Sequence, residues 1–213
     1  MKALRRQHMK DTAELKAMDS LILDEVEVNP MPLHESKKAT LADWEALGED
    51  VRAELIDGEI YYMAPPSRKH QASVSFLHLK IASYLEGKPC KVYPAPFGVY
   101  LHNEDGTTDA VEPDISVICD RDKLSTRGCE GAPTWIIEIV SPGNMAHDYV
   151  TKLSLYLRHG VKEYWIVNPD RETITVYHLA DQDIFPTVYT FRDTIKVHTL
   201  ADLNIDFTQL DLA

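Results

Sequence analysis

Two short apolar runs, each interrupted by one acidic residue, constrain this chain more than any other feature. The first covers residues 111–119 and contains Asp114, and the second covers residues 135–142 and contains Glu138. β-Branched residues dominate both runs, which are too short for stable buried helices, so they predict buried strands. An unpaired ionised carboxylate in a buried strand is costly. The two acids therefore predict either one shared cation or a structural arrangement, in which Asp114 lies in a turn after Pro113 and Glu138 makes a buried ion pair.

The length of 213 residues fits one ordinary domain with an attached arm. No stretch is long and apolar enough to cross a bilayer, and the charged N-terminus lacks the apolar centre of a signal peptide. We therefore expect a cytoplasmic protein with no membrane partner.

The three cysteines, Cys90, Cys119 and Cys129, are an odd number without CxxC spacing. We expect reduced, mostly buried thiols in place of a structural disulfide or a thiolate zinc site. The nine histidines show no HxH or HxxxH spacing and predict no metal site of their own.

The formal net charge of −12 argues against a broad basic surface for nucleic acid. Net charge governs non-specific binding and solubility, whereas a local cluster with a divalent cation can still hold a phosphate. The charge balance thus excludes a broad basic binder but leaves a metal-dependent phosphodiesterase open.

A short helix and a hairpin open the predicted compact part of the chain. Thr40 is an N-cap residue with an acid three positions on and a glycine stop, which predicts a helix over residues 40–48. Residues 53–63 contain two β-rich runs joined by Asp57 and Gly58, a sequence typical of a type I′ turn.

Two longer helices are predicted from apolar spacing. Residues 67–85 contain neither Gly nor Pro and repeat apolar residues at helical intervals after a serine cap. Residues 148–159 end at a glycine, and we expect Val150, Leu153 and Leu157 to form the apolar face of this helix.

The order of strands and helices predicts the architecture. Strand 135–140, a helix and strand 163–167 follow closely enough to form a right-handed βαβ unit. Residues 173–178 and 187–191 predict a final antiparallel pair. The fold class is therefore α/β (α+β), with a mixed sheet flanked by helices.

We divide the chain into three parts. Residues 1–38 are expected to form an N-terminal arm, residues 39–195 the compact domain, and residues 196–213 a weakly structured acidic tail.

Asp114 and Glu138 are candidate metal ligands, because neighbouring strands can present them at the same end of the sheet. Two carboxylates, the backbone carbonyl of Ile139 and waters suit Mg²⁺ or Mn²⁺. Such an ion polarises a phosphoryl oxygen and activates a water, which suits phosphodiester hydrolysis.

Three other positions have both a functional and a structural interpretation. Lys152 follows Asp148 by one helical turn, so it either reaches the phosphate or forms a surface salt bridge. Glu54 is either a third acid of the site or a solvent-facing strand residue. His70 and Arg68 either bind phosphate at a helix N-terminus or form a hydrated helix start.

Six motifs in order give the chain a family resemblance. It resembles the Uma-type restriction endonucleases, a bacterial branch of the PD-(D/E)xK nuclease superfamily, over about residues 40–179. The motifs occupy residues 54–59, 65–70, 112–116, 137–142, 148–152 and 160–169.

The resemblance implies a restriction-endonuclease-like core and DNA cleavage that depends on Mg²⁺ or Mn²⁺. Asp114 and Glu138 match the metal-binding acids of the family, and Glu54 matches the acid before the first core strands. The superfamily lysine is expected two residues after Glu138, where this chain has Val140. In this family a lysine of the following helix takes its place, and Lys152 matches it.

Two main functions follow from these observations, and a phosphoester hydrolase that acts on a smaller substrate stays open as a third. The first is a metal-dependent DNA endonuclease, which the acids and Lys152 favour. The second is a catalytically weak or inactive nuclease-fold protein that serves as a nucleic-acid-binding or assembly module, which the acidic charge and the displaced lysine favour. The resemblance also suggests a homodimer, because superfamily members that cut both strands often work in pairs.

Overall fold

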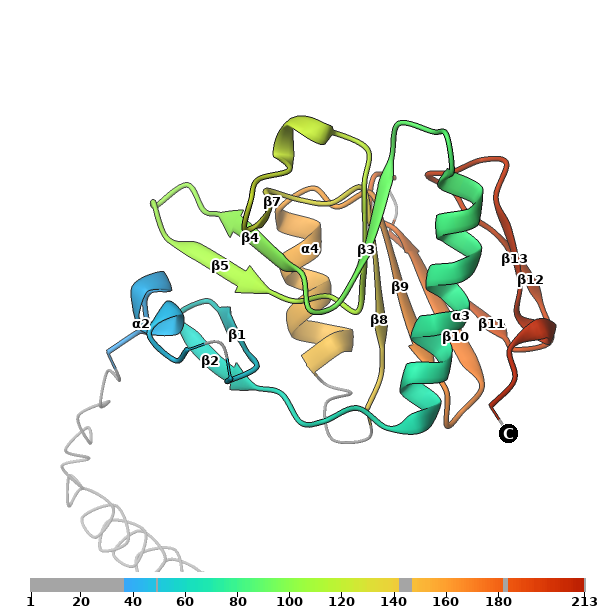
Figure 1. Ribbon diagram of the computed structural model, residues 1–213, viewed down its shortest axis with the longest axis horizontal. Coiled ribbons are helices and arrows are strands. Elements are labelled where there is room, and N and C mark those ends of the chain that lie inside the picture. The colour runs from blue at the N-terminus through green and yellow to red at the C-terminus, as the bar shows by residue number, and fades with distance from the viewer. Residues whose placement is uncertain (1–36, 49, 142–146, 182–183, 213) are drawn as a thin grey trace, which may run out of the picture. The chain divides into compact units, whose positions relative to one another are not determined.

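The computed structural model describes residues 37–48, 50–141, 147–181 and 184–212 (Figure 1). From Lys38 onward the chain forms one compact unit. The arm predicted for residues 1–38 lies outside the described residues up to position 36.

A six-stranded mixed sheet forms the centre of this unit. Its strand order is β11-β10-β9-β8-β6-β3. Strands β8 and β9 run parallel and all the other neighbours run antiparallel. The strands are β3 (Lys91–Pro94), β6 (Ile115–Ile118), β8 (Trp135–Ile139), β9 (Glu163–Asn168), β10 (Thr173–His178) and β11 (Thr187–Thr190).

A second, five-stranded sheet has the order β2-β1-β5-β4-β7. Only its β4–β7 pair is parallel. Its strands are β1 (Ala53–Ile56), β2 (Glu59–Tyr62), β4 (Gly98–His102), β5 (Thr108–Val111) and β7 (Gly128–Glu130), and the 3₁₀ turn η1 (Arg121–Lys123) precedes β7.

The helices cover both faces of the central sheet (Figure 1). One face of helix α3 (Arg68–Leu85) packs against β6, β8, β9 and β10. On the other face of the sheet, α4 (Leu153–Arg158) packs between the two sheets. The mixed sheet flanked by helices confirms the predicted fold class.

Local sequence signals account for the first elements. Thr40 caps α2 (Leu41–Glu45) with a complete capping box. Asp57 and Gly58 have positive φ angles of 52° and 80°, as the predicted type I′ turn requires. Ser67 caps α3, as expected, by accepting a hydrogen bond from the backbone N–H of His70.

The connection from β8 to β9 is the predicted βαβ crossover, but its helix differs from the expectation. It begins as a π-helical turn, η2 (His147–Lys152), and continues as α4. Val150 and Leu157, predicted to be buried, are 67% and 42% exposed. Asp148 and Lys152 are buried in their place, together with Leu155 and Tyr156. The predicted apolar face is therefore wrong for Val150 and Leu157, whereas Leu153 packs partly buried against the core.

The predicted acidic tail is part of the compact domain. Residues beyond 195 form β13 (Asn204–Asp206), which pairs with β12 (Thr194–Lys196), and the 3₁₀ turn η3 (Phe207–Gln209). Ile205 and Phe207 are almost fully buried against the face that α3 covers. The domain boundary expected at residue 195 is thus wrong, because apolar residues at the C-terminus complete the main core.

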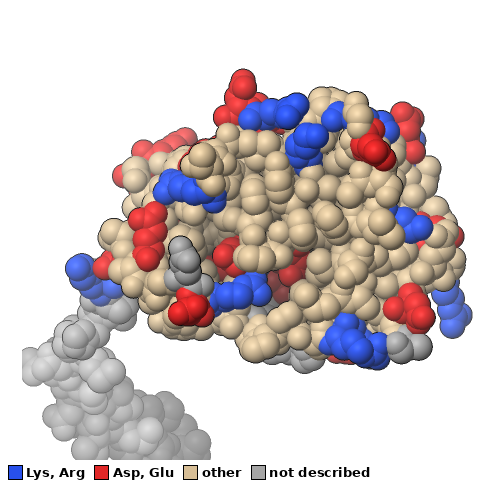
Figure 2. Space-filling model, viewed as in Figure 1, with Lys and Arg blue, Asp and Glu red and all other residues tan. Residues whose placement is uncertain are grey.

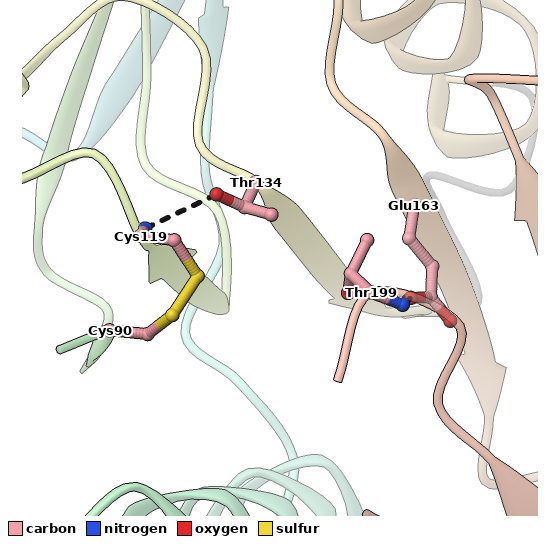
Figure 3. The surroundings of a disulfide bond; sticks show 5 residues. All are labelled: Cys90, Cys119, Thr134, Glu163 and Thr199. Atoms are coloured by element: carbon pink, nitrogen blue, oxygen red, sulfur yellow. Dashed lines mark hydrogen bonds between the residues drawn. A yellow bond between two sulfur atoms is a disulfide. The ribbon is translucent and has the colours of Figure 1, made fainter. Parts of the chain in front are cut away.

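A buried carboxylate ties this C-terminal segment to the central sheet. Glu163, fully buried in β9, accepts hydrogen bonds from the backbone N–H groups of His198 and Thr199, at 3.1 and 2.8 Å. It also accepts from the hydroxyl of Thr199, which lies beside it in Figure 3, and from the Trp165 indole. These four donors compensate the cost of burying the charge.

Cys90 and Cys119 form a disulfide, contrary to the expectation of reduced thiols (Figure 3). The register of β3 with β6 pairs Lys91 with Ile118, so the two cysteines face each other one position beyond the strand ends. This cross-strand pairing was not visible in the sequence spacing. Cys129 is a free, buried cysteine.

Thiol labelling tests this arrangement. Burial raises the pKa of Cys129 to about 11, so its reactive thiolate is scarce at neutral pH. We expect no alkylation of the folded protein, one label after unfolding without reductant, and three labels after unfolding with reductant, counted by mass spectrometry. Three labels without reductant would contradict the disulfide.

Candidate active site

The two strand acids lie opposite each other at one end of β6 and β8. The antiparallel register pairs Ile115 with Ile137, and one position further places Asp114 across from Glu138. The Asp114 backbone N–H donates to Glu138 Oε2 at 3.5 Å, and the Ile139 N–H donates to Asp114 Oδ2 at 2.7 Å. Like charges directly opposite each other destabilise an antiparallel pair, so a cation or a proton must compensate them.

Lys152 supplies one positive charge to this pair. Its Nζ lies 2.9 Å from Glu138 Oε1, 3.0 Å from Glu54 Oε1 and 3.8 Å from Asp148 Oδ1. Lys152 and Asp148 pair along the helix as the sequence indicated, but Lys152 is only 4% exposed. The structure therefore excludes the solvated surface salt bridge.

Glu54 joins the site from the second sheet. The whole of β1 is buried, and Glu54 is 2% exposed, so it is not a solvent-facing strand residue. Besides Lys152, it contacts the Glu112 backbone N–H at 3.1 Å and His147 Nε2 at 3.4 Å. The site thus lies where the ends of both sheets meet the π-helical turn.

His70 and Arg68, both from the first turn of α3, have different surroundings. His70 Nε2 lies 3.2 Å from Asp114 Oδ2, and His70 is 7% exposed. Arg68 points elsewhere and donates to the Leu212 backbone carbonyl at 3.0 Å. The structure therefore brings His70 to the acids but does not bring Arg68 there.

A small cavity of about 70 Å³ opens onto these side chains. Arg52 lines it, with its side chain 38% exposed and its guanidinium held by Glu112 at 3.1 Å. Figure 2 shows acidic atoms set back toward the middle of this face, while Lys and Arg atoms elsewhere are interspersed with Asp and Glu. The lining residues are Arg52, Met63, Ala64, Pro66, His70, Asp114, Glu138, Ile139, Ser141, Asp148 and Lys152.

The acids of the cluster differ in pKa. Burial raises the pKa of Glu138 to about 8, because repulsion from Asp114, Glu54 and Asp148 adds to it and outweighs Lys152. Burial also raises the pKa of Asp148, to about 6. For Glu54, the charge of Lys152 and three hydrogen bonds outweigh burial and lower the pKa to about 2.

The surroundings favour the charged forms of the two basic groups, Lys152 and His70. Burial alone would lower the pKa of Lys152, but its carboxylate neighbours raise it well above the usual value. For His70, the hydrogen bond with Asp114 likewise outweighs burial and raises the pKa. Lys152 is therefore the ammonium partner of ionised Glu54, whereas Glu138 is the acid that burial favours in its neutral form.

The sequence prediction missed several residues of this cluster. Asp148 was noted only as a partner of Lys152, although its spacing one turn before that lysine was a usable signal. Tyr156, whose hydroxyl donates to Glu138 Oε1 at 2.7 Å, looked like an ordinary core residue. Arg52 and His147 lie beside the predicted motifs and carry no signal of their own.

A larger cavity lies away from these acids. It has a volume of about 800 Å³ and lies between α2 and the β4–β5 turn. Arg158, in its wall, is already held by Asp57 at 2.7 Å and Asp109 at 2.9 Å. Its size alone indicates no chemistry, and we place the candidate active site in the smaller cavity.

This arrangement of acids and lysine agrees with a match to a known family. The family model Uma2, described as "Putative restriction endonuclease", matches residues 39–209. The chain belongs to the Uma2 family. The match continues past residue 195, in agreement with the packing of the C-terminal segment in the Uma2 domain.

Two individual proteins are similar to this Uma2 chain. An uncharacterised protein of Synechocystis is 30% identical over 130 residues, which are 60% of this chain and 66% of the relative, just under two thirds of its length. A crystal structure of a putative nuclease belonging to DUF820, from Anabaena variabilis, is 24% identical, with a TM-score of 0.67 over 80% of this chain and 96% of that one. The similarity to the Anabaena structure shows that the two proteins share a fold.

The donor set of the Uma2 site fits a divalent cation that keeps most of its waters. Within the described ranges, no group of three or more His, Cys, Asp or Glu side chains is arranged to hold a metal ion by itself. Mg²⁺ is usually bound through one or two carboxylates, with waters and substrate phosphate completing its shell. Asp114 and Glu138, opposite each other and lining the cavity, meet that requirement.

The raised pKa of Glu138 predicts a pH dependence of stability. The folded Uma2 domain holds this proton between about pH 4.5 and about pH 8, whereas the unfolded chain releases it, so stability falls as pH rises through this range. We expect the free energy of unfolding in EDTA to fall more steeply in the wild type than in Glu138→Gln. Urea unfolding at several pH values measures this difference. Equal slopes of the unfolding free energy against pH in the two proteins would contradict the raised pKa of Glu138.

Among the helices of the described ranges, none is both long enough and apolar enough to cross a membrane.

Proposed function

We propose that this Uma2 protein is a divalent-metal-dependent endonuclease that hydrolyses phosphodiester bonds in DNA. One observation carries the proposal: three buried carboxylates contact the buried Lys152 beside a small cavity, and a fourth, that of Asp114, faces one of them. Two of them, Asp114 and Glu138, lie directly opposite each other. A purely structural cluster would gain by replacing such acids with apolar residues, because buried ion pairs contribute little net stability.

Asp114, Glu138 and the backbone carbonyl of Ile139 would hold Mg²⁺ or Mn²⁺ in this proposal. When bound, the ion supplies the charge that polarises a phosphoryl oxygen and activates a water. The carboxylates of Asp114 and Glu138 would hold the ion at the cavity, and the buried surroundings strengthen every electrostatic contact there.

The remaining groups have roles that follow from their positions. Lys152 presents an ammonium beside Glu138, where negative charge would develop on the phosphate. Arg52, partly exposed at the cavity and fixed by Glu112, binds the phosphate as it enters. His70 holds Asp114, and Glu54 holds Lys152. Arg68, outside the cavity, would contact only the DNA backbone beyond the scissile phosphate.

Two observations favour the alternative of a catalytically weak binding module. The ammonium of Lys152 is already engaged by three carboxylates, and the net charge of −12 opposes non-specific binding to DNA. An inactive relative would keep these ion pairs without turning over a phosphodiester.

A plasmid nicking assay tests the proposal. Wild-type protein should convert supercoiled DNA to nicked or linear product with Mg²⁺ or Mn²⁺, and EDTA should stop the reaction. Glu138→Gln should abolish it, whereas Asp122→Asn, a neutralised exposed acid on η1, should not. Equal cleavage by wild type and Glu138→Gln would overturn the assignment, and binding without cleavage would favour the module.

The product also reports on assembly. If two copies act together as a homodimer, linear DNA should appear without accumulation of the nicked form. Nicked product alone would indicate that each copy cuts one strand independently.

A further inference from the structure

The two oxygens of Glu138 have different surroundings. Oε1 accepts two short hydrogen bonds, from Lys152 Nζ at 2.9 Å and from the Tyr156 hydroxyl at 2.7 Å. Oε2 accepts only a long contact from the Asp114 backbone N–H at 3.5 Å among the bonds of the described residues. One oxygen is therefore fixed by α4 and its π-helical turn, while the other lies on the side of Asp114.

Tyr156 is held rigidly enough to fix that carboxylate. It is fully buried, and its ring meets Tyr164 edge to face with centroids 5.0 Å apart. The hydroxyl of Tyr164 donates to the Asp148 backbone carbonyl at 3.0 Å, which ties the same tyrosine pair to the π-helical turn. The Tyr156 hydroxyl thus has a fixed position relative to both Glu138 and Lys152.

We infer that Tyr156 is a positioning residue for the metal: it holds Oε1 of Glu138 and so directs Oε2, with Asp114, toward the cation. The inference rests on the proposed function. Removing a group that orients a metal ligand commonly weakens metal binding by about 10- to 100-fold. Lys152 alone cannot replace Tyr156, because the ammonium is also shared with Glu54 and Asp148.

Metal selectivity distinguishes positioning from general destabilisation. Mg²⁺ and Mn²⁺ suit a closely defined octahedral geometry, whereas Ca²⁺ tolerates variable ligand positions. Tyr156→Phe keeps the ring and removes only the hydroxyl. We expect calorimetry to show Mn²⁺ and Mg²⁺ binding weakened by about 10- to 100-fold and Ca²⁺ binding weakened by less than about threefold.

A matched control is Tyr177→Phe, which removes the hydroxyl of a neighbouring core tyrosine on β10 that stacks on Tyr164. It should bind all three ions as the wild type does. Should Tyr156→Phe fail to fold, as judged by thermal unfolding, Tyr156→Met removes the same donor while filling similar space, and the same change in selectivity is expected.

The outcomes separate this inference from the proposed function. Wild-type protein that binds no Mn²⁺ would overturn both. Wild-type binding together with equal weakening of Mn²⁺ and Ca²⁺ in Tyr156→Phe, or with no weakening, would overturn the positioning role and leave the proposed metal site standing.

Discussion

Lys152→Met should both destabilise the protein and abolish DNA cleavage. The substitution removes the ammonium that contacts Glu54, Glu138 and Asp148 at 2.9 to 3.8 Å. Breaking a buried ion pair by removing one partner typically costs about 3–5 kcal/mol, because the other charge remains buried. Cleavage should fall by at least about 100-fold, since the charge beside the reacting phosphate is lost.

Two conditions should partly restore the stability of Lys152→Met. Without the ammonium, the folded-state pKa values of the acids lie above those of the unfolded chain, so stability should rise as pH falls. Mn²⁺ should also stabilise the variant, because a cation bound only by the folded state shifts the equilibrium. Urea unfolding measures both effects, with Lys162→Met as an exposed control. A variant as stable as the wild type would contradict the ion-pair cluster.

Asp114→Asn should abolish cleavage without reducing stability. The amide oxygen can still accept the hydrogen bond from the Ile139 N–H, so the local structure is retained. Removing one charge relieves the repulsion across from Glu138. We therefore expect a melting temperature in EDTA equal to or above that of the wild type, and a loss of cleavage on the order of 10³-fold.

A loss of cleavage without a loss of stability in Asp114→Asn would distinguish a functional acid from a structural one. Nicking kinetics and thermal unfolding of the same preparation provide the two values. If Asp114 served only to bind His70 at 3.2 Å, its neutralisation would lower the melting temperature and leave nicking unchanged. That outcome would remove Asp114 from the proposed site.

The burial of the strand acids could be predicted because both runs are apolar almost without interruption, which is typical of strands buried on both faces. Asp114 and Glu138 interrupt apolar runs whose neighbours are almost fully buried, so they had to lie inside. The βαβ unit then required the following helix to return over the sheet, which places Lys152 near the strand ends. The family resemblance selected Lys152 over the surface salt bridge, and the structure shows it buried.

For the helical segment that carries Lys152, the sequence did not predict the buried face correctly. Apolar periodicity assigned Val150 and Leu157 to the core, yet the buried face contains Asp148, Lys152 and Tyr156. Charged residues on a buried face defeat any pattern that treats charge as a sign of exposure. Their burial depends on partners from distant parts of the chain, which a local pattern cannot include.

Long-range pairing explains the other two errors. The disulfide depends on the register of β3 with β6, which brings Cys90 to Cys119 across 29 positions. The C-terminal segment looked like a tail because its apolar residues are few. Ile205 and Phe207 nevertheless fill the core beside α3, and Glu163 anchors the preceding loop.

Anomalous diffraction from crystals soaked in Mn²⁺ is the most direct test of the shared cation. The account predicts one strong peak at about 2.1–2.2 Å from carboxylate oxygens of both Asp114 and Glu138, with Lys152 still on Glu138 Oε1. Saturating Mn²⁺ that leaves no peak between these two carboxylates, or that binds only at the surface, would contradict it.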